Sequence, residues 1–277
     1  MKIIFFGTPN FVLPVLQILH ENFEVIGVVT TPDTIQGRKK ILTPTPVKKY
    51  ALENKIHITD LDQLNDHKQP DLFVVAAYGI IIPKSILNIP KYGSINIHPS
   101  LLPKYRGPSP IQTALLHGEK ENGITIIEMD EEVDHGPILK KIPFSVEPSD
   151  TFQSLHIKMF QKAAKELPQV LKDYVNKNLT PTQQAHTSAT FTERITKEDG
   201  YFNLDQPPSK KVLERMIRAY YPWPTAWTKI KIKNEELRLK LLPDNKIQLE
   251  GGKPMTLKDF YNGHPELKEK IEILLEE

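Results

Sequence analysis

The 277-residue sequence predicts an α/β fold with a mostly parallel sheet, followed by a smaller β-rich domain. The first observation is that short apolar runs alternate with segments of helical spacing through the first part of the chain. Such alternation favours right-handed connections between parallel strands. The second observation is that a polar stretch rich in Thr, Gln and Ser separates this part from short strand-like pieces further on. We therefore expect two domains of unequal size.

The first domain is expected to begin with strand, helix and strand. The expected strands are residues 2–7, 24–30, 55–58 and 71–77, and the expected helices are 12–20 and 47–54. The run at 71–77 is continuously apolar, which is typical of a strand buried on both faces of a sheet. The turn after the first strand contains only Gly7, so the Gly-x-Gly-x-x-Gly dinucleotide pattern is absent. We expect neither NAD nor FAD.

A long helix is expected to close the first domain. Asp150 and Gln153 have the spacing of a capping box, and apolar residues recur at helical spacing from there to Tyr174. Pro168 is expected to break or kink this helix, because proline lacks the N–H of a helical hydrogen bond. After a polar stretch, a helix at 209–220 and strands at 227–233 and 236–242 are expected. We predict domains at 1–178 and 205–277 and a linker at 179–204.

Composition excludes several classes of site. The 36 basic and 34 acidic residues give a net charge of only +2, so a polyanionic partner must bind a local basic patch. The absence of cysteine excludes disulfides and thiolate metal sites, and we expect no metal. Met1 leads directly into the first predicted strand, without a signal sequence or a long apolar span. We expect a cytoplasmic protein without membrane association.

Two polar side chains lie on one face of an otherwise apolar strand. Residues 94–97 are expected to form this strand, so Asn96 and His98 point the same way, ~6.6 Å apart along it. An amide and an imidazole are suited to stabilising an oxyanion, and histidine also titrates near neutral pH. The alternative is a core histidine that is hydrogen-bonded by a neighbouring asparagine.

The segment 96–107 carries a longer pattern, Asn-x-His-x-Ser-Leu-Leu-Pro-x-x-Arg-Gly. It resembles the signature of the enzymes that use 10-formyltetrahydrofolate as a formyl donor. Residues 123–129 are expected to form the next strand, and the following Asp-x-x-x-Asp-x-Gly-Pro loop places Asp134 at the position of the family's third catalytic residue. The resemblance implies that Asn96, His98 and Asp134 are catalytic.

The same resemblance implies a folate site and a fold. The residues expected to contact the folate are Ser100, Leu101, Leu102, Pro103, Gly79, Ile80, Ile82 and Val133. A flat heterocycle requires an apolar slot with accessible backbone amides, which the loop after residues 71–77 can offer. The implied fold is a Rossmann-like formyltransferase domain followed by an OB-like β-barrel. A barrel of this kind has five strands, and the sequence pattern lacks about two of them, so we expect a shortened barrel.

The formyl acceptor is indicated by the loop at 32–48, which resembles the insertion loop of methionyl-tRNA formyltransferases. A long basic loop can reach a phosphate backbone or an unpaired acceptor end. We expect Arg38, Lys39, Lys40 and Arg106 to bind methionyl-initiator tRNA. Residues 215–227 resemble the start of the family's carboxyl-terminal domain. We expect this protein to be a monomer. The alternatives are an amino-sugar nucleotide formyltransferase and a catalytically silent RNA-binding relative.

Overall fold

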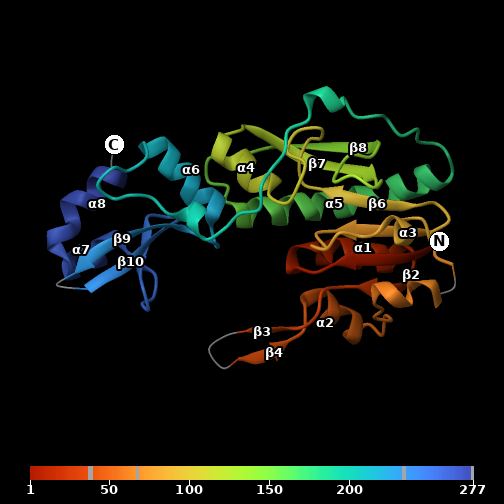
Figure 1. Cartoon of the computed structure of the whole chain (residues 1–277), viewed down its shortest axis with the longest axis horizontal. Coiled ribbons are helices and arrows are strands. Elements are labelled where there is room, and N and C mark those ends of the chain that lie inside the picture. The colour runs from red at the N-terminus through yellow and green to blue at the C-terminus, as the bar shows by residue number, and fades with distance from the viewer. Residues whose placement is uncertain (37–39, 67–68, 233–234, 276–277) are drawn as a thin grey trace. The chain divides into compact units, whose positions relative to one another are not determined.

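The computed structural model describes the chain except for residues 37–39, 67–68, 233–234 and 276–277 (Figure 1). Contacts divide the chain into two compact units. Unit 1 contains Met1–Gly107, Asn122–Phe144 and His156–Phe191, and unit 2 contains Pro108–Glu121, Ser145–Leu155 and Thr192–Glu277. The domain boundaries expected at residues 178 and 204 remain predictions.

A six-stranded sheet has the order β2-β1-β5-β6-β7-β8. Its strands are β1 (Lys2–Gly7), β2 (Glu24–Val29), β5 (Leu72–Ala76), β6 (Ser94–His98), β7 (Glu121–Glu128) and β8 (Ile138–Ser145). The pairs β1–β2, β1–β5 and β5–β6 are parallel, and β6–β7 is antiparallel. The predicted mostly parallel sheet is therefore confirmed. The strand expected at 55–58 is wrong, because among the described residues this segment makes only an isolated bridge, between Ile58 and Val28.

Between these strands along the chain lie the helices α1 (Leu13–Asn22), α2 (Pro46–Glu53), α3 (Lys84–Leu87) and α4 (Pro110–His117), and α5 (Phe152–Val175) follows the last strand. Thr45 caps α2 by accepting a hydrogen bond from the Lys48 N–H at 3.1 Å. Thr151 does the same for α5 by accepting from the Ser154 N–H at 3.1 Å. The capping box expected at Asp150 is therefore wrong.

Pro168 does not break α5, which continues to Val175. A proline in a helix interior removes one backbone hydrogen bond and crowds the preceding turn. The apolar side of α5 keeps Leu167, Val170 and Leu171 buried on both sides of the proline. Burial of this apolar face offsets the local cost of the proline.

An aromatic cluster fills the core beneath β1 and β5. Phe6 and Phe73 have ring centroids 4.9 Å apart, and Tyr78 lies edge-on to Phe6 at 5.5 Å. Ile82 and Leu87 complete this core from the segment after β5. The cluster fixes the start of the loop that follows β5, where a ligand contact was predicted.

A small antiparallel hairpin occupies the loop that was interpreted as an insertion. Its strands are β3 (Thr34–Gln36) and β4 (Ile41–Thr43), and Figure 1 shows it projecting from the sheet of unit 1. Ile35, Ile41 and Leu42 are all exposed on it. The loop thus carries exposed apolar side chains in addition to the basic residues at 38–40 in its sequence.

Unit 2 contains a four-stranded antiparallel sheet of order β12-β11-β10-β9. The strands of this sheet are β9 (Ala226–Ile232), β10 (Glu235–Leu242), β11 (Lys246–Leu249) and β12 (Met255–Thr256). The same stretch of chain forms the helices α6 (Lys210–Tyr220), α7 (Leu257–Gly263) and α8 (Lys268–Leu275). The sequence pattern indicated one strand fewer. Asp244 and Asn245 both have positive φ, so a tight turn reverses the chain and produces β11. No pairing within the described residues joins β9 to β12, so this sheet is open.

Candidate active site

The carboxyl end of β6 presents Asn96 and His98 on one face of the sheet. β6 lies between β5 and β7, so its backbone is paired on both sides and its position is fixed. Ile95 and Ile97 alternate with the polar residues and are buried on the opposite face. The strand alternation predicted from the sequence therefore places both polar side chains together.

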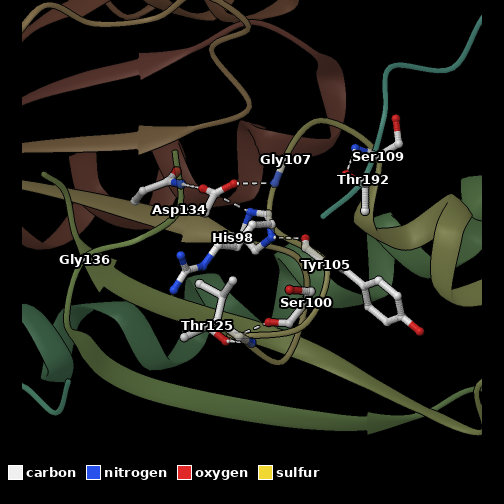
Figure 2. Close-up of polar contacts among 12 residues, drawn as sticks. His98, Ser100, Tyr105, Gly107, Ser109, Thr125, Asp134, Gly136 and Thr192 are labelled. Atoms are coloured by element: carbon white, nitrogen blue, oxygen red, sulfur yellow. Dashed lines mark hydrogen bonds and ion pairs between the residues drawn. The ribbon is translucent and has the colours of Figure 1, made fainter. Parts of the chain in front are cut away.

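Asp134 meets these two side chains from the loop after β7 (Figure 2). Its Oδ1 accepts a hydrogen bond from the Asn96 amide at 3.1 Å and lies 3.3 Å from His98 Nδ1. Its Oδ2 accepts from the Gly107 N–H at 2.8 Å. The structure thus brings together the three residues predicted as catalytic, and we call Asn96, His98 and Asp134 the polar cluster.

The electrostatics of the polar cluster favour a charged Asp134. Burial by itself raises the pKa of this carboxyl, but the opposing charge of His98 and the hydrogen bonds from His98, Gly107 and Asn96 lower the pKa below its ordinary value. His98 Nε2 lies 2.9 Å from the Tyr105 carbonyl oxygen, which can only accept. Both ring nitrogens therefore face acceptors, and the imidazolium form satisfies both.

The backbone of the Asp134 loop is tightly constrained. Asp134 has φ of 52°, a left-handed conformation that is uncommon for residues with a side chain. Two residues later, a Cβ on Gly136 would lie 2.0 Å from the Glu128 carbonyl oxygen. Only glycine fits there, so the chain is held close to the end of β7 and the carboxylate is aimed at β6.

The Ser100–Pro103 segment, predicted to contact folate, is pinned to β7 by Thr125. The Thr125 hydroxyl donates to the Ser100 carbonyl at 2.7 Å and accepts from the Leu102 N–H at 3.0 Å. Ser100 Oγ donates to the Lys104 carbonyl at 2.6 Å. Leu101 packs against Gly123, where a Cβ would lie 2.4 Å from it. The segment is rigid next to the polar cluster, and its folate contacts remain a prediction.

The other predicted folate residues differ in accessibility. Ile80 is 47% exposed and Val133 is 57% exposed, whereas Ile82 is 6% exposed and packs in the aromatic core. Gly79 has φ of 88°, and no atom lies within 4 Å of the position that a Cβ would take. Ile80, Val133 and Gly79 are thus open to a ligand, while Ile82 supports the loop from below. Their roles remain predictions.

The predicted tRNA residues lie in two different environments. Arg38 and Lys39 lie outside the described residues, and Lys40 is an exposed residue next to β4. Arg106 is buried, and its Nη2 donates to Gln184 Oε1 at 2.7 Å and to His186 Nδ1 at 2.9 Å. The described contacts of Arg106 are therefore with the protein's own side chains. Its assignment to tRNA remains a prediction.

Sequence reasoning missed the backbone groups that complete the site. The Tyr105 carbonyl and the Gly107 N–H contact His98 and Asp134, and no side-chain pattern reveals such groups. It also missed Gln184, which lies in the predicted linker and bonds to the Asp134 carbonyl at 2.9 Å. A lone glutamine in a polar stretch gives no signal that could have found it.

Among the described residues, no group of three or more His, Asp or Glu side chains is arranged to hold a metal ion. No helix in that part of the chain is both long and apolar enough to cross a membrane.

Comparison with known proteins identifies two family models in the chain. The model described as "Formyl transferase" matches residues 1–171, and "Formyl transferase, C-terminal domain" matches residues 194–245. The match to the first covers the polar cluster and both loops around it. Both the predicted family and the two-part fold are therefore confirmed.

Curated relatives and a solved structure show which members of the family this chain is similar to. Methionyl-tRNA formyltransferase of Marinobacter nauticus is 39% identical over 237 residues, covering 82% of this chain and 76% of the relative. The enzyme of the same name from Caldicellulosiruptor saccharolyticus is 37% identical over 306 residues, covering 95% and 97%. An N-formyltransferase from Helicobacter canadensis, solved with folinic acid and dTDP-3-aminofucose, has a TM-score of 0.66 at 18% identity and covers 89% of this chain and 94% of that one.

The two kinds of comparison have different weight. At 18% identity the Helicobacter canadensis structure shows the fold of this chain, and its folinic acid is a ligand of that protein. The curated relatives share far more sequence over most of both chains, and they carry one name. The chain therefore belongs to the formyl transferase family, among its methionyl-tRNA formyltransferases.

Proposed function

We propose that the protein transfers the formyl group of 10-formyltetrahydrofolate to the α-amino group of methionyl-initiator tRNA. The observation that carries this proposal is the polar cluster, in which an amide, an imidazole and a buried carboxylate converge within 3.3 Å. Formyl transfer to an amine needs a stabilised tetrahedral oxyanion and a route for protons between two nitrogens. The polar cluster supplies a group for each need.

The proposed mechanism begins with attack of the neutral amine on the formyl carbon. A new C–N bond forms, and the carbonyl oxygen becomes an oxyanion. Asn96 uses one amide hydrogen on Asp134, so its second hydrogen is directed to the oxyanion together with the charge of His98. Asp134 keeps His98 positively charged and takes up the amine proton, directly or through water. Return of that proton to the folate nitrogen completes breakage of the donor C–N bond, which releases tetrahydrofolate.

The folate is proposed to lie against the loop that follows β5. Gly79 and Ile80 would offer backbone amides and an apolar wall, with Val133 on the opposite side, and these residues are accessible. The Ser100–Pro103 segment would limit the depth of this slot, because Thr125 holds it rigidly to β7. A slot of this kind suits a flat ring whose polar edge bonds to main-chain groups.

The tRNA is proposed to contact the β3–β4 hairpin and the basic residues Arg38, Lys39 and Lys40. The exposed Ile35, Ile41 and Leu42 can pack on unpaired bases, while the cations contact phosphates. We propose that the enzyme acts as a monomer in the cytoplasm, where charged tRNA is used in translation.

The direct test is formyl transfer from 10-formyltetrahydrofolate, measured with methionyl-initiator tRNA and, in parallel, with an amino-sugar nucleotide. Formylated methionyl-tRNA and no formylated sugar are expected. Formylation of the sugar nucleotide alone would establish the alternative acceptor. If a folded sample binds RNA but forms neither product, the protein is a catalytically silent RNA-binding relative.

A further inference from the structure

The segment from Thr182 to Phe191 lies within the predicted linker, yet it packs on the loops that form the polar cluster. Thr182 exchanges two backbone hydrogen bonds with Ile138, at 2.7 and 2.9 Å, just after the Asp134 loop. Thr190 accepts from the Arg106 N–H at 2.8 Å, and its own N–H donates to the Pro103 carbonyl at 3.2 Å. The segment therefore bonds to both sides of the site within unit 1.

Gln184 lies in the middle of this segment and is only 4% exposed. Its Nε2 donates to the Asp134 carbonyl at 2.9 Å and to the Gly136 carbonyl at 2.8 Å. Its Oε1 accepts from Arg106 Nε at 3.2 Å and Nη2 at 2.7 Å. Carbonyls only accept and a guanidinium only donates, so these partners fix the orientation of the amide. All four of its hydrogen-bonding positions are used.

These contacts act on the backbone of Asp134 and, through Arg106, on the residue beside the donor to its Oδ2. Gln184 holds the carbonyl of Asp134 itself, at the residue whose left-handed φ of 52° aims the side chain at β6. Gln184 also holds Arg106, the neighbour of Gly107, whose N–H binds Asp134 Oδ2. The Gln184 side chain thus fixes Gly107 and Asp134, the donor and the acceptor of this hydrogen bond, relative to one another. Loss of the Gln184 side chain would allow the strained Asp134 loop to relax.

We propose that Gln184 is a positioning residue for formyl transfer, which holds the Asp134 carboxylate in register with His98 and Gly107. The proposal rests on the proposed function, because it assumes that Asp134 takes part in the chemistry. Gln184 touches no reacting atom and acts only through the Asp134 loop and Arg106. A displacement of the carboxylate by about 1 Å can cost on the order of 100-fold in rate.

The test compares variants of the full-length enzyme in steady-state formylation of methionyl-initiator tRNA. Gln184→Met keeps the length of the side chain and removes all four hydrogen bonds. Gln184→Glu keeps the bonds to Arg106 and removes only the two donated to the Asp134 loop, so it serves if the methionine variant does not fold. For both we expect kcat to fall ~10- to 100-fold, with KM for tRNA and folate within about twofold of the parent value. The matched control is Gln183→Met, because Gln183 is the exposed neighbour and should leave kcat unchanged.

A double variant separates positioning from a general loss of structure. If Gln184 acts through Asp134, then Asp134→Asn combined with Gln184→Met should be no slower than Asp134→Asn alone. Multiplied rate losses, or a parental kcat in a folded Gln184→Met or Gln184→Glu enzyme, would overturn the proposal. A parental rate for Asp134→Asn alone would instead remove the proposed function of Asp134, so the two failures are distinguishable.

Discussion

Replacing Asp134 with asparagine tests the central element of the site. The two side chains have the same shape, but an amide has only one oxygen. In the structure Oδ1 faces the donors of Asn96 and His98, and Oδ2 faces the Gly107 N–H. Whichever way the new amide turns, its NH₂ group points at a donor, so at least one hydrogen bond is lost.

The size of the effect follows from these contacts. A buried donor left without an acceptor costs about 1–3 kcal/mol of folding free energy. His98 Nδ1 also loses the carboxylate that lies 3.3 Å from it, and the proposed route for the amine proton is removed. Positioned acid–base groups contribute ~10²- to 10⁴-fold, so kcat of Asp134→Asn should fall by a factor in that range.

The assay is single-turnover formylation of methionyl-initiator tRNA, with separate binding measurements for tRNA and folate. Both affinities should stay near the parent values, because Asp134 is proposed to act on the reaction and not on ground-state binding. A rate within about threefold of the parent enzyme would refute the assigned role. Loss of tRNA binding with normal single-turnover chemistry would refute it equally.

The lowered pKa of Asp134 adds a dependence on pH with a definite sign. A carboxyl whose pKa is lower in the folded state stabilises the fold above its unfolded pKa. This contribution is lost as pH falls through the folded pKa, in the acidic range below about pH 4. The stability difference between the parent and Asp134→Asn should therefore shrink as the solution is acidified through that range, which chemical denaturation at several pH values can measure. A difference that stays constant would show that the charge of Asp134 contributes nothing to folding.

Three further predictions concern other parts of the molecule. Asn96→Ala should lower kcat by about 10²- to 10³-fold in the same assay by removing one oxyanion donor, and a loss in KM alone would contradict this. Arg38→Ala should slow transfer to tRNA and leave folate affinity unchanged in a binding titration, whereas a collapse of folate affinity would make the loop structural. Phe73→Ala should destabilise the fold by ~3–5 kcal/mol in chemical denaturation, because Phe73 is fully buried against Phe6, and a change below about 1 kcal/mol would argue against a close-packed aromatic core.

The sequence sufficed for the sheet and for the polar cluster because both depend on local pattern. Alternating apolar runs predicted the parallel strands, and the strand period placed Asn96 and His98 on one face. In both cases a short stretch of chain carries enough information to specify the local geometry. Asp134 lies in a different segment, and only the resemblance to a known family supplied it.

Individual side-chain hydrogen bonds could not be predicted from the periodicity of the sequence. Thr151 caps α5 instead of Asp150, whose carboxylate accepts from the Glu147 N–H and the Ser154 hydroxyl. Gln184 contacts Asp134 across 50 residues of sequence, and no periodicity marks such a pairing. The missed strand β11 differs, because the Asp244–Asn245 pair that precedes it is a turn signal of the sequence itself.

The position of Gln184 also affects the order in which the enzyme can assemble. A chain emerging from the ribosome completes all six strands of its main sheet by Ser145, well before Thr182 to Thr190 is made. Until that segment docks, the Asp134 loop lacks the two hydrogen bonds that Gln184 donates to Asp134 and Gly136, so we expect folding of the sheet and gain of full activity to be separate events in time. A fragment ended at residue 178 would keep every strand of the sheet and every member of the polar cluster, and it would lack the segment that aligns them. We therefore expect a truncated enzyme to approach the parental rate only if it extends at least through Phe191.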